Sequence, residues 1–169
     1  MSEDRNTEID LEAFRTAKEI RNLEIGLFWQ RSNHFLVLST AIAAGFFTIN
    51  NSNSTHALLL AMFGLVVAVL WFAVNLGSKF WQSRWEYRLW EAEKHLRSDL
   101  NLFSAPWEIV KEDVRKAFEF RPRGRVHRLY TNLVMLKPSV TMMMTMLSAS
   151  FALFWIALFA ATLWKLLTQ

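Results

Sequence analysis

The sequence contains no cysteine, which excludes disulfide bonds, thiolate metal ligands and a cysteine nucleophile. Glycine and proline are also scarce, with 5 and 3 residues, so neither a turn-rich β fold nor long disordered linkers are expected. Common catalytic patterns are missing too: there is no nucleophile elbow, no phosphate-binding glycine loop and no cluster of metal ligands. We therefore expect neither an enzyme nor a bound cofactor or metal ion.

Charge is missing from three long stretches of the chain. Ser139–Trp164 has no charged residue, and neither does the stretch from His56 to Gly77. A third apolar stretch around Phe35–Ile49 reaches the length of a span if it begins near Phe28. A helix needs about 20 apolar residues to cross the hydrocarbon layer. We therefore predict an all-α integral membrane protein with three transmembrane helices, at about 28–50, 56–77 and 138–165, and a helical cytoplasmic region.

The basic residues predict the orientation of these spans. The segment 1–34 has five Lys and Arg residues and 78–137 has thirteen, whereas the turn after the first span has none and the C-terminal end has only Lys165. Basic residues concentrate in cytoplasmic loops. We therefore expect a multi-pass protein of the bacterial inner membrane, with the N-terminus and residues 78–137 in the cytoplasm and the C-terminus outside. The acidic start of the chain does not resemble a signal peptide.

The two cytoplasmic segments show helical patterns. In residues 1–27 apolar residues recur every three or four positions, and Thr7 with Asp10 resembles a capping box that would start the helix. The segment 78–137 should begin as a continuation of the second span, with Trp81, Trp85 and Leu89 on its apolar side. A further helix should start near Pro106, with Ser104 as its N-cap, and end near Phe120. We expect these segments to pack against each other or against other copies.

Small residues four positions apart occur in every span. Such pairs allow close contact between membrane helices, although they also arise by chance in alanine-rich spans. We predict helix packing or oligomer contacts at Ala41, Gly45, Gly64, Ala68, Ser148 and Ala152. Thr141, Thr145 and Ser148 share one face of the third span, where they either bond back to their own helix or line a polar path in an oligomer.

The densest positive run is Arg121, Arg123, Arg125 and Arg128, shortly before the third span. Its expected role is to fix the topology and contact anionic lipid headgroups, and the alternative is a phosphate-bearing ligand. Nucleic acid is not the expected partner. Anchoring at the membrane surface is predicted for aromatic and basic residues at the ends of the spans: Trp29, Arg31, Trp81, Arg84, Trp85 and Trp164.

Ionisable residues are absent from the middle of each predicted span. Ion-coupled transporters and proton pumps nearly always carry such a group, so neither activity is expected. Two Arg–His pairs, Arg88/His95 and Arg121/His127, loosely match a motif of small helical ribonucleases. With 19 basic residues and 4 His, such matches arise by chance.

Two stretches of the sequence are similar to a known family. They are Arg31-Ser32-Asn33-His34-Phe35-Leu36 at the first span and the Trp- and Glu-rich exit of the second span, from Trp81 to Glu93. In both, the chain resembles bacterial octameric membrane proteins of the RipA type. It also looks similar to effectors with a paired-helix membrane module in bacterial nucleotide-signalling defence systems, from which its third span departs. The resemblance implies a homo-oligomer in the cytoplasmic membrane, a pore or scaffold in defence or stress, and no catalytic residues.

Two functional hypotheses follow from the sequence. In the first, the chain self-associates in the inner membrane as an oligomeric channel-like effector or membrane scaffold. In the second, it is a membrane-anchored binding module whose basic cytoplasmic segment recruits a soluble protein or an anionic ligand. Membrane lipids and copies of the chain itself are the expected partners, and a soluble protein is a further candidate.

Overall fold

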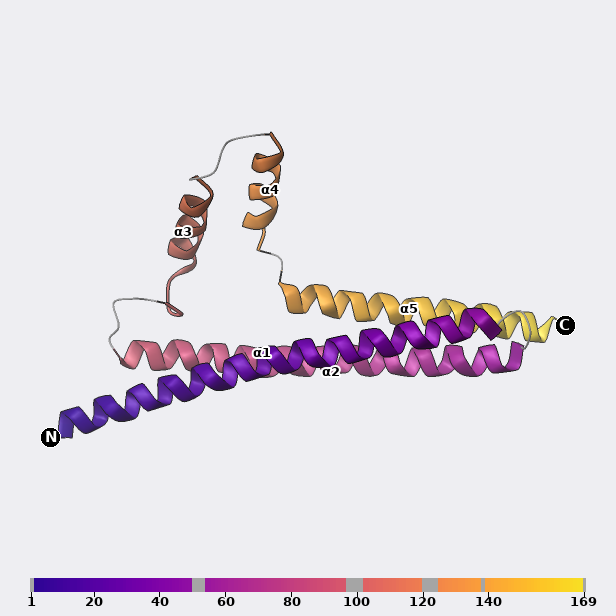
Figure 1. The fold of residues 1–169 in the computed structure, drawn as a ribbon, viewed down its shortest axis with the longest axis horizontal. Coiled ribbons are helices and arrows are strands. Elements are labelled where there is room, and N and C mark those ends of the chain that lie inside the picture. The colour runs from indigo at the N-terminus through magenta and orange to yellow at the C-terminus, as the bar shows by residue number, and fades with distance from the viewer. Residues whose placement is uncertain (1, 50–53, 97–101, 120–124, 138, 169) are drawn as a thin grey trace. The chain divides into compact units, whose positions relative to one another are not determined.

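The computed structural model describes residues 2–49, 54–96, 102–119, 125–137 and 139–168. These residues form the helices α1 (Ser2–Ile49), α2 (Ser54–His95), α3 (Trp107–Glu119), α4 (Arg125–Met135) and α5 (Val140–Leu167) (Figure 1). Helices α1, α2 and α5 are long and apolar enough to cross a membrane. The predicted all-α fold with three membrane-spanning helices is therefore confirmed.

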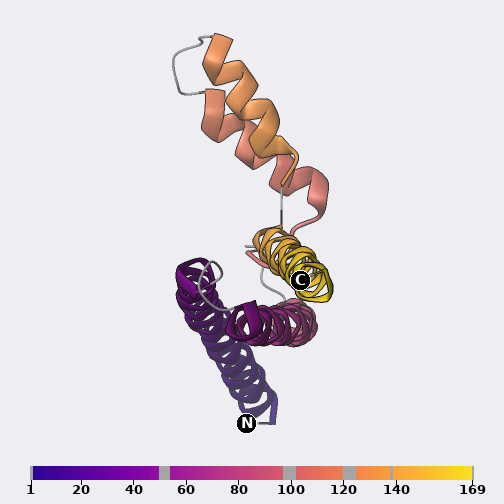
Figure 2. The same cartoon turned by 90° about the vertical axis from the view of Figure 1, so that its right-hand side faces the viewer.

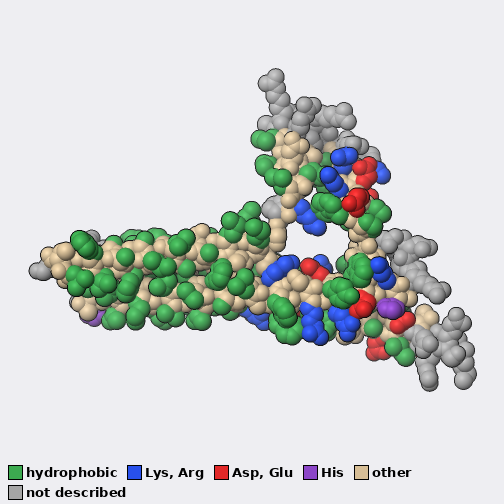
Figure 3. Space-filling model, turned by 180° about the vertical axis from the view of Figure 1, so that it is seen from behind, with side chains coloured by type: hydrophobic (Ala, Val, Ile, Leu, Met, Phe, Trp, Pro, Cys, Tyr) green, Lys and Arg blue, Asp and Glu red, His purple; other side chains and the backbone are tan. Residues whose placement is uncertain are grey.

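The chain divides into two compact units. Residues 23–82 and 140–169 form the unit that we call the membrane unit, and residues 1–22 and 83–139 form the unit that we call the helical unit. Helices α1 and α2 each contribute to both units. On the face drawn in Figure 3, hydrophobic side chains cover the membrane unit, and acidic and basic side chains gather on the helical unit.

The helix boundaries agree with the sequence in part. As predicted, α2 continues past Gly77 without a break, and α3 covers the expected residues. The prediction that this helix starts at a capping box at Thr7 is wrong, because α1 begins at Ser2. The helix therefore extends further toward the N-terminus than the capping box predicts.

The membrane unit packs its helices through a repeat of seven residues. The buried residues of α5 are Thr141, Ser148, Trp155 and Thr162, each seven positions after the last. In the part of α2 that belongs to this unit, one row of buried positions alternates in steps of four and three residues: Ala57, Ala61, Gly64, Ala68, Trp71, Asn75, Ser78 and Gln82. Val67 is buried beside this row. This spacing is typical of helices that pack side by side in a left-handed coiled coil. Figures 1 and 2 both show α5 lying alongside α2.

One end of the membrane unit has an apolar core around Trp155. Its indole ring is fully buried and meets Phe46 of α1 edge to face, with 5.9 Å between the ring centroids. Ala57, Ala61 and Ala68 of α2 belong to the same cluster. Small residues on α2 therefore provide the space in which a large aromatic ring of α5 packs.

The helical unit is held together by aromatic contacts. Phe14 of α1 packs against Phe103, which precedes α3, with 6.0 Å between the ring centroids. Arg21 lies over the same Phe103 ring at 5.7 Å. Helices α3 and α4 form a hairpin in which Phe118 contacts Tyr130. The expected packing of the N-terminal helix against the central segment is confirmed.

The predicted apolar side of α2 in this region needs a correction. Leu89 is buried, but Trp81 is 45% exposed, and the neighbouring Gln82 is buried instead. The prediction used steps of four residues, which drift around the helix because a turn contains about 3.6 residues. The seven-residue repeat continues through Ser78, Gln82, Trp85 and Leu89, and therefore leaves Trp81 outside the core.

Candidate functional site

The other end of the membrane unit holds a polar layer inside the helix bundle. We define it by Arg31 of α1, Asn75, Ser78 and Gln82 of α2, and Thr141 and Ser148 of α5. Asn75, Ser78 and Gln82 are 1%, 2% and 6% exposed, and Ser148 is fully buried. Buried polar groups in a membrane helix are costly unless they find partners, so their hydrogen bonds decide what the layer does.

Asn75 makes two hydrogen bonds to α5. Its Nδ2 donates to Ser148 Oγ at 3.2 Å and to the backbone carbonyl oxygen of Met144 at 3.1 Å. The Ser148 hydroxyl in turn donates to the carbonyl oxygen of Thr145 at 2.8 Å. A buried asparagine at one position of a seven-residue repeat fixes how two helices are aligned along their length.

Two further contacts extend the layer. The Thr141 hydroxyl donates to Gln82 Oε1 at 3.1 Å, one seven-residue repeat away from the Asn75 contact. Arg31 Nη1 lies 3.4 Å from Ser78 Oγ and links α1 to α2. All three helices of the membrane unit are therefore joined by side chains near one end of the bundle. Except for Arg31, these side chains carry no ionisable group, so the layer suits helix alignment rather than proton transfer.

The predicted polar face of the third span takes part in this layer. Thr141 and Ser148 face α2, and Thr145 bonds back to the carbonyl oxygen of Thr141 at 2.8 Å. Back-bonding was one of the two alternatives drawn from the sequence. The contacts of Asn75 and Gln82 were not predicted, although polar residues at 75, 78 and 82 stand out at helical spacing.

The small-residue pairs lie in different surroundings. Gly64 and Ala68 are buried inside the chain, and Gly64 lies against the Trp155 ring. Ser148 is buried and Ala152 is partly buried against the apolar core. Gly45 faces Leu60 of α2, whereas Ala41 is exposed on α1. Ala41 is therefore the member of these pairs that is most open to contacts outside the chain.

The predicted anchors at the membrane surface are mostly exposed. Trp29, Trp81 and Trp164 are 50%, 45% and 72% exposed. Arg84 is exposed and lies over the ring of the half-buried Trp85 at 6.0 Å. Of the basic run, Arg121 and Arg123 lie outside the described residues. Arg125 and Arg128 belong to α4, but their side chains are also outside the description.

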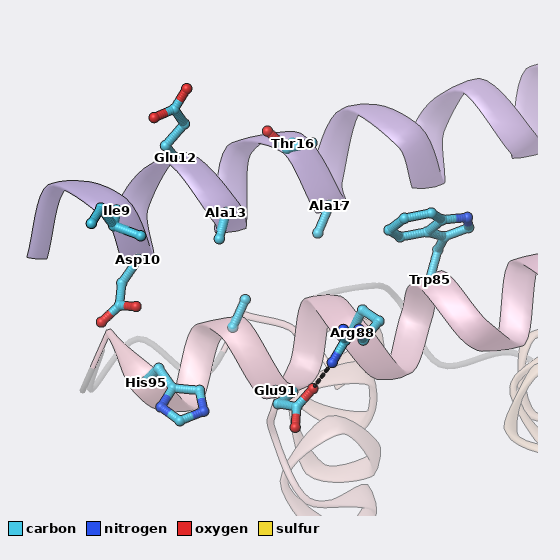
Figure 4. Close-up of a pocket in the computed structure, with 11 residues that line it drawn as sticks. Ile9, Asp10, Glu12, Ala13, Thr16, Ala17, Trp85, Arg88, Glu91 and His95 are labelled. Atoms are coloured by element: carbon cyan, nitrogen blue, oxygen red, sulfur yellow. Dashed lines mark hydrogen bonds and ion pairs between the residues drawn. The ribbon is translucent and has the colours of Figure 1, made fainter. Parts of the chain in front are cut away.

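A groove of about 650 Å³ opens in the helical unit between α1 and α2. Ala13 and Ala17 point toward α2, and Trp85 points toward α1 (Figure 4). Its ionisable residues are Asp10, Glu12, Arg88, Glu91 and His95. Arg88 Nη1 pairs with Glu91 at 2.8 Å on the exposed side of α2. The groove therefore combines a small, apolar floor with a rim of both charge signs.

Glu93 of α2 binds the residues that shortly precede α3. Its carboxylate accepts backbone N–H groups from Leu102, Phe103 and Ser104 at 2.7, 2.8 and 2.6 Å, and the Ser104 hydroxyl also donates to it. Burial alone would raise the pKa of Glu93, but these hydrogen bonds outweigh it and lower the pKa below 4.5. Ser104 was wrongly predicted as the N-cap of α3, because the carbonyl oxygen of Pro106 accepts the first helical bonds, from Ile109 and Val110.

Comparison with known proteins identifies the family. A model of the octameric membrane protein family (8xMP) matches residues 11–164. The chain belongs to this family. The match extends over most of the three apolar helices and into both units, so the resemblance to octameric membrane proteins is confirmed. No curated protein and no solved structure matches the chain.

Membership of the octameric membrane protein family gives the apolar helices a context. The chain is a self-associating membrane protein with several membrane-spanning helices. Among the residues that the structure describes, no group of three His, Asp or Glu side chains is placed to hold a metal ion. The polar layer and the groove are therefore the features of this family member that offer a specific role to named side chains.

Proposed function

We propose that eight copies of this chain assemble in the bacterial inner membrane and act as a membrane scaffold or channel-like effector in defence or stress. The N-terminus and residues 78–137 would face the cytoplasm, with the C-terminus outside. The family name supports the number of copies. The excess of basic residues in the segments 1–34 and 78–137 supports the orientation.

The observation that carries this proposal is the uncovered surface of the apolar helices. Within the most apolar part of each helix, only 22% of the residues in α1 and 17% in α5 are buried inside the chain. Val37 and Phe47 on α1 are 62% and 59% exposed, and Leu153 on α5 is 68% exposed. These faces are available to lipid and to neighbouring copies. Ala41, exposed on α1, would allow a close approach of a second helix.

The polar layer favours a scaffold over a pore. Asn75, Gln82, Thr141 and Ser148 bind one another inside a single chain, so they would not line a shared channel between copies. Their contacts instead fix the arrangement of the three helices that each copy brings to the assembly. A channel would have to be lined by other faces of α1 or α5.

Measuring the membrane potential of growing bacteria distinguishes a channel-like effector from a scaffold. Expression of a channel-like effector should depolarise the inner membrane, whereas a scaffold should assemble without depolarisation. Planar bilayers containing the purified octamer provide the matching measurement in isolation. An octamer that neither conducts nor changes the membrane potential selects the scaffold. A protein that stays monomeric in lipid contradicts both versions.

The groove in the helical unit favours a second candidate function, a membrane-anchored binding module. Ala13 and Ala17 leave room for an inserted side chain, and the mixed charges of the rim suit a protein partner. Ala13 is exposed, so Ala13→Trp should fill the groove without disturbing the core, and Lys18→Trp on exposed α1 surface is the matched control. A partner lost only with Ala13→Trp supports this function.

The basic run gives an independent test of the binding module. Neutralising Arg121, Arg123 and Arg125 together should abolish binding of a soluble partner or anionic ligand while the oligomer remains intact. Loss of the oligomer itself would instead assign these residues to assembly.

A further inference from the structure

Helix α4 has an apolar side whose leucines are each more than half exposed. Tyr130 contacts Phe118 of α3, and Val134 and Met135 are half-buried. By contrast, Leu129, Leu133 and Leu136 are 63%, 53% and 76% exposed. A step of four residues places Leu129 and Leu133 on one side of α4, and Leu136 follows in the turn directly after its end, where its N–H bonds to the carbonyl oxygen of Leu133. We call these three residues the leucine stripe.

The charges around the leucine stripe favour a negatively charged surface. The sequence of α4 contains Arg125 and Arg128 but no acidic residue, and Lys137 follows shortly after its end. Helix α3, its partner in the hairpin, instead carries both signs of charge, with four acidic residues and three basic ones: Glu108, Glu112, Asp113 and Glu119, and Lys111, Arg115 and Lys116. Basic amphipathic helices bind anionic lipid surfaces through this combination of an apolar side and positive charge.

The connection to α5 keeps this helix near the membrane. Helix α4 ends at Met135 and α5 begins at Val140. Five residue steps span at most about 18 Å, so the end of α4 is tied closely to the start of a membrane-spanning helix. Lys137 has a φ of 47°, and its N–H bonds to the carbonyl oxygen of Val134 at 2.9 Å. Because this left-handed turn ends α4, α4 is a separate helix and not an extension of α5.

We propose that α4 is an interfacial helix that inserts its leucine stripe into an anionic lipid surface beside the third span. A second copy of α4 is a poorer occupant of the stripe, because both helices would carry the same positive charge and repel each other. The contact would hold the α3–α4 hairpin against the bilayer. The proposal depends only on the membrane-spanning helices, and it holds whether the assembly is a scaffold or a binding module.

The absence of cysteine allows this contact to be tested at single positions in the full chain. Leu133→Cys places a fluorescent label on the leucine stripe, and Lys116→Cys places the same label at an exposed position of α3 as a control. Both proteins are reconstituted into nanodiscs that contain phosphatidylglycerol. Lipids brominated on their acyl chains should quench the label at 133 several-fold more than the label at 116. Iodide in the water should quench the label at 133 several-fold less than the label at 116.

Three results would overturn the proposal. Equal quenching of the two labels by brominated lipid would show that the leucine stripe does not contact the acyl chains. Disulfide cross-linking of the unlabelled Leu133→Cys variant between neighbouring copies, without lipid quenching of its labelled form, would assign the stripe to a second copy. Equal quenching in phosphatidylglycerol and phosphatidylcholine would remove the role of negative charge.

A further variant tests the stripe as a unit. Leu129→Gln with Leu136→Gln, added to Leu133→Cys, should lower lipid quenching several-fold at unchanged oligomer mass, because the polar side chains no longer favour the acyl chains. Unchanged quenching would also contradict the proposal.

Discussion

The indole ring of Trp155 occupies the space beside Gly64 that any larger residue would need. A Cβ added to Gly64 would lie 2.7 Å from Cζ2 of that ring and closer still to Cε2. The ring cannot easily move away, because it is fully buried and packs edge to face against Phe46. Among the described glycines, Gly64 is therefore the one at which an added Cβ would clash with a neighbouring helix.

Gly64→Ala should destabilise the membrane unit. Overpacking a core costs about 1–3 kcal/mol, and the better helix propensity of alanine returns at most about 1 kcal/mol. We therefore expect a lower midpoint of unfolding in mixed micelles containing an ionic detergent. Gly77→Ala in the same helix is the control, because a Cβ there meets nothing within 4 Å, and it should be neutral or stabilising. Equal effects at the two glycines would rule out the role of the Trp155 ring.

The Asn75–Ser148 contact should contribute measurable coupling energy. Hydrogen bonds between membrane helices have coupling energies of about 0.6 kcal/mol on average and reach roughly 1.7 kcal/mol. Asn75→Ala, Ser148→Ala and the double variant form a cycle that isolates this term. Thr40→Ala removes a hydroxyl that bonds only to its own helix and should show no coupling with Asn75→Ala. A coupling energy of zero between 75 and 148 would contradict the aligning role of the polar layer.

Glu93 should make stability depend on pH. Because its folded pKa is lowered, its contribution is complete above about pH 4.5 and is lost as the pH falls through the lower folded pKa. Glu93→Gln should cost about 1–3 kcal/mol at pH 7, since charged hydrogen bonds to three N–H groups are weakened. The difference from the unchanged protein should shrink at acidic pH. Glu91→Gln, in an exposed pair with Arg88, is the control with little expected effect.

Much of the fold could be predicted from the distribution of charge. Three intervals without charge predicted α1, α2 and α5 as spanning helices, because the hydrocarbon layer sets a minimum length of apolar helix. The register between the helices could not be predicted, since spacings of three and four residues look alike over a few turns. For this reason the sequence did not predict that Gln82 is buried and Trp81 is exposed. The hydrogen-bond partners of Asn75 were missed for the same reason.

Contacts between residues on either side of a turn also could not be predicted from the sequence. Ser104 fits a helix N-cap by residue type, but Glu93 binds it from the preceding helix. The preference of serine for a helix start is a local property, and a carboxylate that satisfies three N–H groups at once outweighs it. The groove between α1 and α2 likewise depends on which faces meet, and composition alone does not reveal that.

The number of copies in the membrane is the most direct test of the account, because self-association is its central claim. Native mass spectrometry of the 19.8 kDa chain released from lipid nanodiscs measures it without labels. We predict a defined complex of eight chains that persists on dilution. A monomer at every protein concentration would contradict the assembly, and with it the proposed scaffold and channel-like functions.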